Sequence, residues 1–368
     1  MHTLDLIKPD GRQITLYSES LIENVADVPS PFSQPQNANP HLRWHPLRGE
    51  WIAYAAFRQN RTFQPPPEYN PLAVTTDPAN PTEMPTGNYD IAVFDNRFPS
   101  LALAATDLPN LTVETAVANG HCEVVVFTQD PAASLASLPA ARINLLLQVW
   151  ADRTQRAASN PQIRYVLPFE NRGAEVGVTL HHPHGQIYAY PFVPPVPQRM
   201  LSQEKVYFDA LPAAEAGHRN LLSDMVQAEL VAGTRILYNG SHAVAFVPAC
   251  ARYPYEVWVM PNTPVEGFAA LSMPQREDLA RALKTVLLKY DGLWQRPFPY
   301  LMAWYQAPTD GMPHPETQLH AQFSPPYRSR DRLKYLAGTE LAAGMFAMDA
   351  LPEEKAKELQ AIQVAFAS

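Results

Sequence analysis

The chain has 368 residues, 46% hydrophobic and 17% charged, a balance typical of a globular protein that excludes a chain disordered throughout. Its formal net charge of -8 at pH 7 argues against a general nucleic-acid binder, because such proteins normally present a basic surface. The opening lacks the pattern of a signal peptide, and no apolar run approaches the roughly 18 residues of a membrane span. Two cysteines, Cys122 and Cys250, fit a reducing compartment, so we expect a cytoplasmic protein with no membrane partner.

Two hairpins are predicted where alternating apolar residues flank a turn sequence. The first surrounds the turn at residues 8–11, and the second surrounds Asn239-Gly240. Between them, many of the 38 prolines cluster at 29–40 and 65–85. Because proline disfavours helices, we expect extended segments that lie on a surface, with a disordered linker as the alternative for 65–85.

An internal repeat follows. Residues 122–187 read as a strand (CEVVVF), a helix, a second strand (IRYVLPF) and a histidine cluster (LHHPHGQI), while residues 255–326 read as YEVWVM, a helix, YLMAWY and ETQLHAQFSPP. Ser137 and Ser272 each stand two residues before a proline, so we expect them to cap the two helices. The repeated order predicts a duplicated fold, and the alternative is a coincidence between two ordinary strand-helix-strand runs.

The repeat also predicts how many active centres the chain has. It matches His182-x-His184 in the first half to His320-x-Gln322 in the second, so only the first half keeps both histidines. A duplicated fold that needed two identical sites would keep both pairs. We therefore predict one active centre per chain, built mainly by the first half.

The histidine cluster LHHPHGQI has three interpretations. A zinc site needs about four ligands, usually in paired spacing, and neither cysteine has such a partner. A purely structural cluster would need a buried partner for each imidazole. The third interpretation is a histidine nucleophile, and it explains more of the residues.

In the nucleophile interpretation His184 attacks phosphorus while its other ring nitrogen is held by a nearby carbonyl, such as that of His182. Gly185 lets a phosphate approach the backbone closely. Gln186 offers a neutral donor to a phosphoryl oxygen and cannot act as a base for water. These three residue types in sequence favour a group-transfer site.

At this point the sequence resembles the galactose-1-phosphate uridylyltransferase family, a branch of the histidine triad superfamily. The resemblance runs from "HPLRGEWIAYAAFRQNR" through "FDNRFPSL" and "FENRGAEVGVTLHHPHGQIYAYPF" to "QLHAQFSPPYRSRDRLKYLAGTE". Its core is the run from His182 to Gln186, because histidine triad hydrolases usually carry a third histidine where this chain has Gln186. That difference favours a transferase.

The resemblance implies a two-step exchange. The residue matching His184 attacks the α-phosphate of UDP-glucose, releases glucose 1-phosphate and keeps a uridylyl group, which galactose 1-phosphate then accepts. The expected partners are thus a UDP-hexose and a hexose 1-phosphate. By the same resemblance His182 orients the nucleophile through its carbonyl and Gln186 contacts the transferred phosphate.

Further substrate-binding residues carry over from the family by position. Arg97 stands where some members have an acidic residue, and Phe346 stands where the family has a glutamine that contacts sugar hydroxyls, so galactose as the natural sugar is less firmly implied. The residues expected to bind substrate are Arg58, Arg61, Asn96, Phe98, Asn171, Thr179, Lys334, Gly338 and Glu340.

Many family members hold metal ions, but most of the matching positions here carry other residues. A zinc site would fall on Asn70, Ala73, Pro131 and His182. A second metal site would fall on Met200, Tyr305, His320 and Gln322. We therefore expect no cofactor and a metal-independent enzyme whose packing replaces the metal ions.

The fold class implied is α+β, a duplicated histidine-triad-like fold with two mostly antiparallel sheets and packed helices, divided into halves 1–195 and 196–368. The resemblance also implies a homodimer. Rival functions are an ADP-sugar or dinucleoside polyphosphate phosphorylase that uses the same histidine, a histidine triad hydrolase, and a non-catalytic nucleotide-binding protein. The sequence shows no decisive base-reading motif that would separate the first rival.

Overall fold

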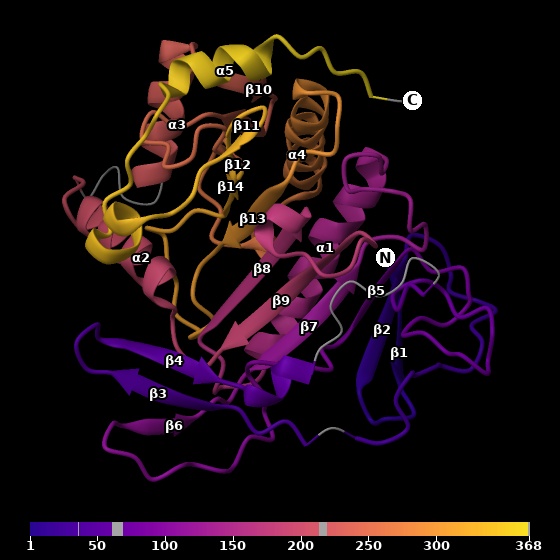
Figure 1. The fold of residues 1–368 in the computed structure, drawn as a ribbon. Coiled ribbons are helices and arrows are strands. Elements are labelled where there is room, and N and C mark those ends of the chain that lie inside the picture. The colour runs from indigo at the N-terminus through magenta and orange to yellow at the C-terminus, as the bar shows by residue number, and fades with distance from the viewer. Residues whose placement is uncertain (36, 61–68, 213–218, 367–368) are drawn as a thin grey trace.

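The computed structural model describes residues 1–35, 37–60, 69–212 and 219–366. Eleven strands of these residues form one antiparallel sheet in the order β1-β2-β5-β7-β9-β8-β13-β14-β12-β11-β10 (Figure 1). Their bounds are β1 His2–Ile7, β2 Gln13–Ser18, β5 Ile91–Asp95, β7 His121–Val126, β8 Tyr165–Arg172, β9 His184–Tyr190, β10 Ile236–Asn239, β11 Ala243–Phe246, β12 Val257–Pro261, β13 Tyr300–Tyr305 and β14 His320–Ser324.

Two small sheets and several helices complete the fold. The small sheet β4-β3-β6 projects from one end of the large sheet (Figure 1), and β15 pairs with β16. None of the described helices is long and apolar enough to cross a membrane. The remaining bounds are β3 His41–His45, β4 Glu50–Tyr54, β6 Thr115–Val117, β15 Tyr327–Ser329, β16 Arg332–Leu333, α1 Ala140–Ala158, α2 Pro195–Asp209, α3 Leu221–Ala232, α4 Met273–Leu293, α5 Pro352–Gln360, and the short helical turns η1 Ala56–Asn60, η2 Ala174–Val176, η3 Phe268–Ala270 and η4 Thr339–Ala343.

The large sheet has matching strands on the two sides of the pair β8–β13, except for β1 at one edge. Outward from this pair the order is β9, β7, β5, β2, β1 on one side and β14, β12, β11, β10 on the other. The two sets are joined directly, because β8 and β13 pair from Tyr300↔Arg172 to Ala303↔Phe169. The predicted α+β class with antiparallel strands and packed helices is confirmed, and the strands of the two halves form one continuous sheet.

The predicted match between the two halves is shifted by two residues. Nδ1 of His184 bonds to the carbonyl of residue 182 at 2.7 Å, and Nδ1 of His320 bonds to the carbonyl of Gln318 at 2.8 Å. Both histidines also begin the corresponding strands, β9 and β14. His320 thus matches His184, and Gln322 matches Gln186. The sequence match was wrong because it aligned histidine with histidine and ignored the strand register.

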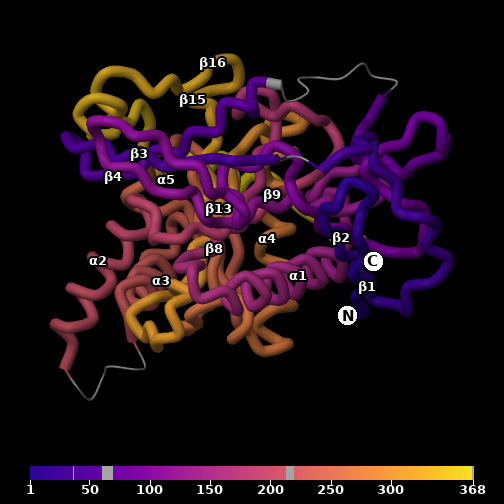
Figure 2. The backbone as a smooth tube through the Cα atoms, turned by 90° about the horizontal axis from the view of Figure 1, so that it is seen from below, coloured from indigo at the N-terminus to yellow at the C-terminus, as the bar shows by residue number. Residues whose placement is uncertain are grey.

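Helices cover one face of the sheet along its length. α1 and α4 pack side by side (Figure 2) against residues such as Val125, Ile187 and Val259. On the other face α3 packs on Phe246 of β11, while in the first half segments without helices cover Phe94 and its neighbours. The alternation of side chains along each strand separates these two cores. The outer face of the first half is the one that carries the candidate site.

Most local predictions are confirmed. The two hairpins form as β1–β2 and β10–β11, and the described residues of the proline-rich stretches contain neither a helix nor a regular strand. Residues 65–68 lie outside the described residues. Ser272 caps α4 together with Gln275, but Ser137 does not cap α1. Its hydroxyl donates to the carbonyl of Ser134 instead, so α1 begins without a side-chain cap.

Candidate active site

The imidazole of His184 is held in one tautomer at the start of β9. Its Nδ1 donates to the carbonyl of His182 at 2.7 Å, so Nε2 carries the lone pair. Burial lowers the pKa of His184 below its ordinary value, which keeps the ring neutral near pH 7. A neutral, oriented imidazole with a free lone pair can act as a nucleophile.

His184 lines two cavities. The first, of about 400 Å³, is called here the Phe32 cavity and contains several of the predicted substrate residues. The second, of about 590 Å³, is called here the Arg296 cavity and contains His182 and Asn171. The predicted residues in the Phe32 cavity are Arg58, Asn96, Phe98, Thr179 and Gln186.

A chain of hydrogen bonds connects four of these residues. Arg58 donates to the carbonyl of Phe98, and the Phe98 amide donates to Oδ1 of Asn96 at 2.8 Å. This second bond fixes the Asn96 amide, whose Nδ2 donates to Oε1 of Gln186 at 3.5 Å. Since the Gln186 oxygen is thereby engaged, its NH₂ group is left to donate into the cavity beside His184.

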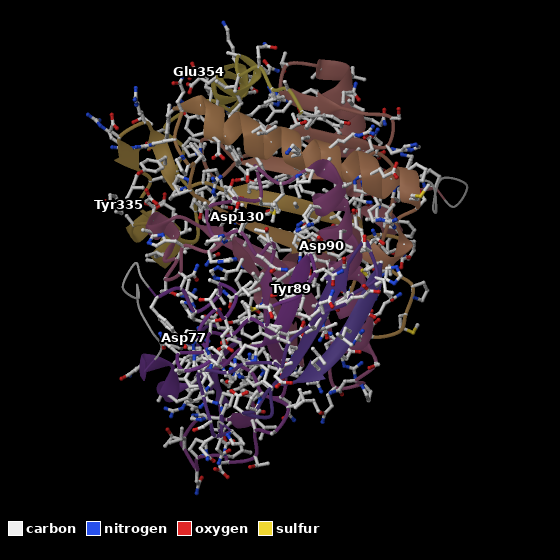
Figure 3. The ribbon with its side chains drawn as sticks, turned by 90° about the vertical axis from the view of Figure 1, so that its right-hand side faces the viewer. Asp77, Tyr89, Asp90, Asp130, Tyr335 and Glu354 are labelled. Carbon is white, nitrogen blue, oxygen red and sulfur yellow. The ribbon has the colours of Figure 1, made fainter. Side chains whose placement is uncertain are left out.

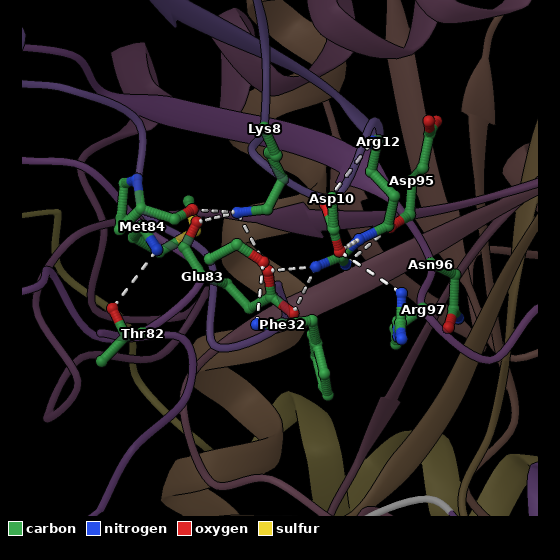
Figure 4. Close-up of polar contacts among 12 residues, drawn as sticks. Lys8, Asp10, Arg12, Phe32, Thr82, Glu83, Met84, Asp95, Asn96 and Arg97 are labelled. Atoms are coloured by element: carbon green, nitrogen blue, oxygen red, sulfur yellow. Dashed lines mark hydrogen bonds and ion pairs between the residues drawn. The ribbon is translucent and has the colours of Figure 1, made fainter. Parts of the chain in front are cut away.

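The Phe32 cavity is lined by Glu83 and Arg97, which belong to a buried charge network that joins distant segments (Figure 4). Lys8 of the first hairpin lies 2.9 Å from the carboxylate of Glu83, and Arg12 lies 2.8 Å from the same carboxylate. The Arg97 guanidinium stacks 4.3 Å above the Phe32 ring. An aromatic ring with cationic neighbours suits a planar, anionic ligand such as a nucleotide.

Sequence reasoning missed Phe32 and Glu83 as parts of this wall, and Lys8 as the buried partner of Glu83. Lys8 and Glu83 are 75 residues apart in the chain, and nothing in the sequence shows that they meet. Phe32 lies in a proline-rich segment that was expected only to cover a surface. A lysine inside a hairpin turn is normally exposed, so its complete burial carried no signal.

The Arg296 cavity has a polar wall. Oδ1 of Asn171 is buried without a hydrogen-bond partner among the described residues. Arg172 forms a two-pronged pair with Asp291 at 2.7 and 3.0 Å. Burial raises the pKa of Glu170 to about 7, although it accepts a hydrogen bond from Tyr300 at 2.9 Å. These groups suit a hydroxyl-rich, anionic ligand.

The predicted residues of the acceptor segment lie apart from His184. Lys334 and Glu340 line a separate cavity of about 480 Å³, where they pair at 3.7 Å. Gly338 precedes the short turn η4 in the same segment. Figure 3 shows the neighbouring Tyr335 at the margin of the molecule. Arg61 lies outside the described residues, and its role stays a prediction.

The residues at the family zinc position do not fit a metal ion. Both ring nitrogens of His182 are bound, Nε2 to the carbonyl of Thr128 at 2.7 Å and Nδ1 to the amide of Asn70 at 3.0 Å. Ala73 and Pro131 have no donor side chain. Zinc would therefore meet an amide and two apolar side chains at three of its four expected positions.

The second family metal position has the same difficulty, because His320 uses both nitrogens in bonds to Gln318 and Gln322. Elsewhere in the described residues, Asp95, His121 and Glu123 form a group that could hold a metal ion. In that group Arg153 also bonds to the Glu123 carboxylate. The Arg153 charge would have to be displaced or tolerated by any cation there.

A solved structure described as a uridylyltransferase has the same fold. It matches with a TM-score of 0.74 and 29% identity over 87% of this chain and 97% of that one. An ADP-glucose phosphorylase from Arabidopsis thaliana matches with a TM-score of 0.65 at 23% identity, covering 89% of this chain and all of that one, which shows the fold alone. The fold and the site together define a protein of the uridylyltransferase class.

The family follows from the sequence comparisons. The N-terminal domain of galactose-1-phosphate uridyl transferase matches residues 31–194, and its C-terminal domain matches residues 202–367. Galactose-1-phosphate uridylyltransferases from Thermotoga maritima and Streptomyces lividans are 34% and 35% identical, over 88% and 86% of this chain and 98% and 86% of theirs. The chain belongs to the galactose-1-phosphate uridylyltransferase family.

Proposed function

We propose that the chain exchanges a uridylyl group between UDP-glucose and galactose 1-phosphate through a covalent adduct on His184. The family catalyses UMP transfer between these two compounds. The observation that carries the proposal is the geometry of His184, whose Nδ1 is bound to a backbone carbonyl and whose ring lines two cavities at once. The two cavities offer space for a nucleotide and for a sugar phosphate next to the same imidazole.

The chemistry balances in two displacements. Nε2 of His184 attacks the α-phosphorus, a new N–P bond forms, and the bond to the bridging oxygen breaks as glucose 1-phosphate leaves. A phosphate oxygen of galactose 1-phosphate then attacks the same phosphorus and the N–P bond breaks, which returns the neutral imidazole. The proton on Nδ1 stays in place, and the carbonyl of His182 stabilises the positive charge of the intermediate.

The surrounding residues have matching roles in the proposal. The NH₂ group of Gln186 donates to a phosphoryl oxygen, and Arg58 adds positive charge at the nucleotide side. Asn171 and Thr179 make further contacts near the phosphates, and Asn96 and Phe98 contact the nucleotide in the Phe32 cavity. No metal ion takes part, because the ring nitrogens of His182 are already bound.

We also propose that the chain works as a homodimer in the cytoplasm. Lys334 and Glu340 line a cavity that does not include His184, so they reach the substrate only if their segment moves or a second subunit supplies it. Mixed dimers of His184→Ala and Lys334→Ala chains separate these cases. Activity restored by mixing supports supply from the second subunit, whereas two inactive variants that stay inactive together support a contact within one chain.

Intact-mass spectrometry tests the central step. The protein is incubated with UDP-glucose and no acceptor, beside His184→Ala. A gain of one UMP on the wild type alone, discharged by galactose 1-phosphate, is the expected result. An adduct only with an ADP-sugar would assign the chain to the phosphorylase rivals. No adduct with either donor would contradict covalent transfer and favour a nucleotide-binding protein.

A further inference from the structure

The ring of His182, two residues before the proposed nucleophile, is buried, and both of its nitrogens are hydrogen-bonded. Only 1% of the residue is exposed. Nε2 lies 2.7 Å from the carbonyl of Thr128, and Nδ1 lies 3.0 Å from the side-chain amide of Asn70. A carbonyl can only accept, so Nε2 carries the proton and Nδ1 must accept.

The orientation of the Asn70 amide agrees with this assignment. Its Oδ1 accepts a hydrogen bond from the backbone amide of Leu72 at 3.0 Å. The NH₂ group is therefore the end that faces Nδ1 of His182, and no flip of the amide satisfies both neighbours. Each atom in the set thus has one role, which is the condition for a fully satisfied buried network.

This network anchors the carbonyl that orients the nucleophile. The His182 ring is tied to Thr128, just after β7, and to Asn70 in the segment that covers the outer face. The following residue is also held, because the Phe127 amide donates to the carbonyl of Pro183 at 3.2 Å. The backbone between these anchors carries the carbonyl that accepts from His184.

We propose that Asn70 is a positioning residue for the uridylyl transfer. Through the His182 ring, its amide fixes the backbone carbonyl that sets the tautomer and direction of His184. The Asn70 amide donates to Nδ1 of His182, the ring atom that a metal ion would bind. A neutral hydrogen-bond donor thus holds the ring here in place of a metal ion. The inference rests on the proposed role of His184 as the nucleophile.

Asn70→Asp is the sharpest variant. The carboxylate keeps the acceptor for the Leu72 amide and nearly the same volume, but it presents an oxygen to the lone pair of Nδ1. Asn70→Leu removes both hydrogen bonds at similar size. Asn88→Asp is the matched control, because Asn88 also accepts from a backbone amide (Glu23, 2.6 Å) and donates to a carbonyl (Leu21, 2.9 Å). Neither of these bonds involves His182 or His184.

Two measurements are made on each variant. Single-turnover formation of the UMP adduct from UDP-glucose should be about 10- to 100-fold slower for both Asn70 variants, with donor affinity within about twofold of wild type. Nitrogen-15 NMR of the histidine rings in the free protein should show a pyridine-type Nδ1 on His182 in the wild type and in Asn88→Asp, and its loss in Asn70→Asp. Circular dichroism confirms that each variant is folded.

The outcomes separate the inference from the proposed function. Wild-type adduct rates in both folded Asn70 variants, or an unchanged His182 spectrum in Asn70→Asp, would overturn the inference and leave His184 as the nucleophile. If the wild type forms no adduct, the proposed function fails. The NMR measurement needs no substrate, so it still tests whether Asn70 contacts His182. The positioning role is then rejected together with the reaction.

Discussion

The side-chain amide of Gln322 lies 3.2 Å from Nε2 of His320, the ring that matches His184 in the second half. Nδ1 of His320 is also bound, and only 3% of the residue is exposed. Because both nitrogens are satisfied, this ring has no lone pair for a substrate. We expect peptide mapping of the UMP-labelled protein to find the group on His184 alone, and a labelled His320 would contradict this account.

A methyl group at Gly185 should disturb the site. A Cβ there would lie 2.8 Å from Cζ of Phe127 and 2.9 Å from the carbonyl of Phe169. We expect Gly185→Ala to cost about 1–3 kcal/mol of unfolding free energy, because the packed core has no space for the added methyl group. We also expect it to slow adduct formation at the adjacent His184. Gly338→Ala, which meets nothing within 4 Å, is the control for stability in thermal unfolding.

Loss of the Glu83 charge should destabilise the wall of the Phe32 cavity. The Glu83 carboxylate balances Lys8, whose side chain is 0% exposed, and also Arg12. We expect Glu83→Gln to cost about 3–5 kcal/mol, because it leaves a buried ammonium without its partner. Glu50→Gln breaks the exposed pair with Arg48 and should cost less than about 1 kcal/mol in urea unfolding. Equal losses in the two variants would contradict the prediction.

Glu170 should make the protein less stable as the pH rises. Burial raises the pKa of Glu170 to about 7 from an ordinary value of 4.5. The folded state therefore keeps a proton that the unfolded state loses, so stability present below pH 4.5 falls progressively until about pH 7. The full effect is of order 3 kcal/mol. Glu170→Gln should unfold at a higher temperature than wild type at pH 8, and the difference should shrink at pH 4.5.

Chelation should leave the enzyme intact. The His182 ring offers no free nitrogen to a metal ion, and its neighbours at the family zinc position lack metal-binding side chains. We expect dialysis against EDTA to change neither the unfolding temperature nor the rate of adduct formation. Near-stoichiometric zinc in the purified protein, lost together with activity, would show that the prediction is wrong.

Features set by neighbouring residues were predictable from the sequence. The HPHGQ run identified the carbonyl that holds His184, because the two residues are only two positions apart. Strand alternation likewise predicted both hairpins, and the internal repeat predicted the duplicated order of elements. These inferences needed only periodicity and spacing.

Contacts between distant segments were not predictable. Asn70 and His182 are 112 residues apart, and the sequence interpretation treated Asn70 only as a missing metal ligand. The shifted match of His320 also required the strand register, which pairing with neighbouring strands decides. Ser137 failed as a cap because its Oγ accepts from the Ser134 amide at 2.9 Å, and because α1 begins later in the chain, with Pro139 at the N-cap.

The pairing of β8 with β13 affects how each half would behave as a separate fragment. Each of these strands would be the edge of its own sheet if the halves were separate. An edge strand exposes unpaired backbone groups that recruit strands from other chains. The pairing of β8 with β13 covers both edges at once, so we expect a fragment cut between the halves to aggregate through β8 or β13, and the intact chain to aggregate less.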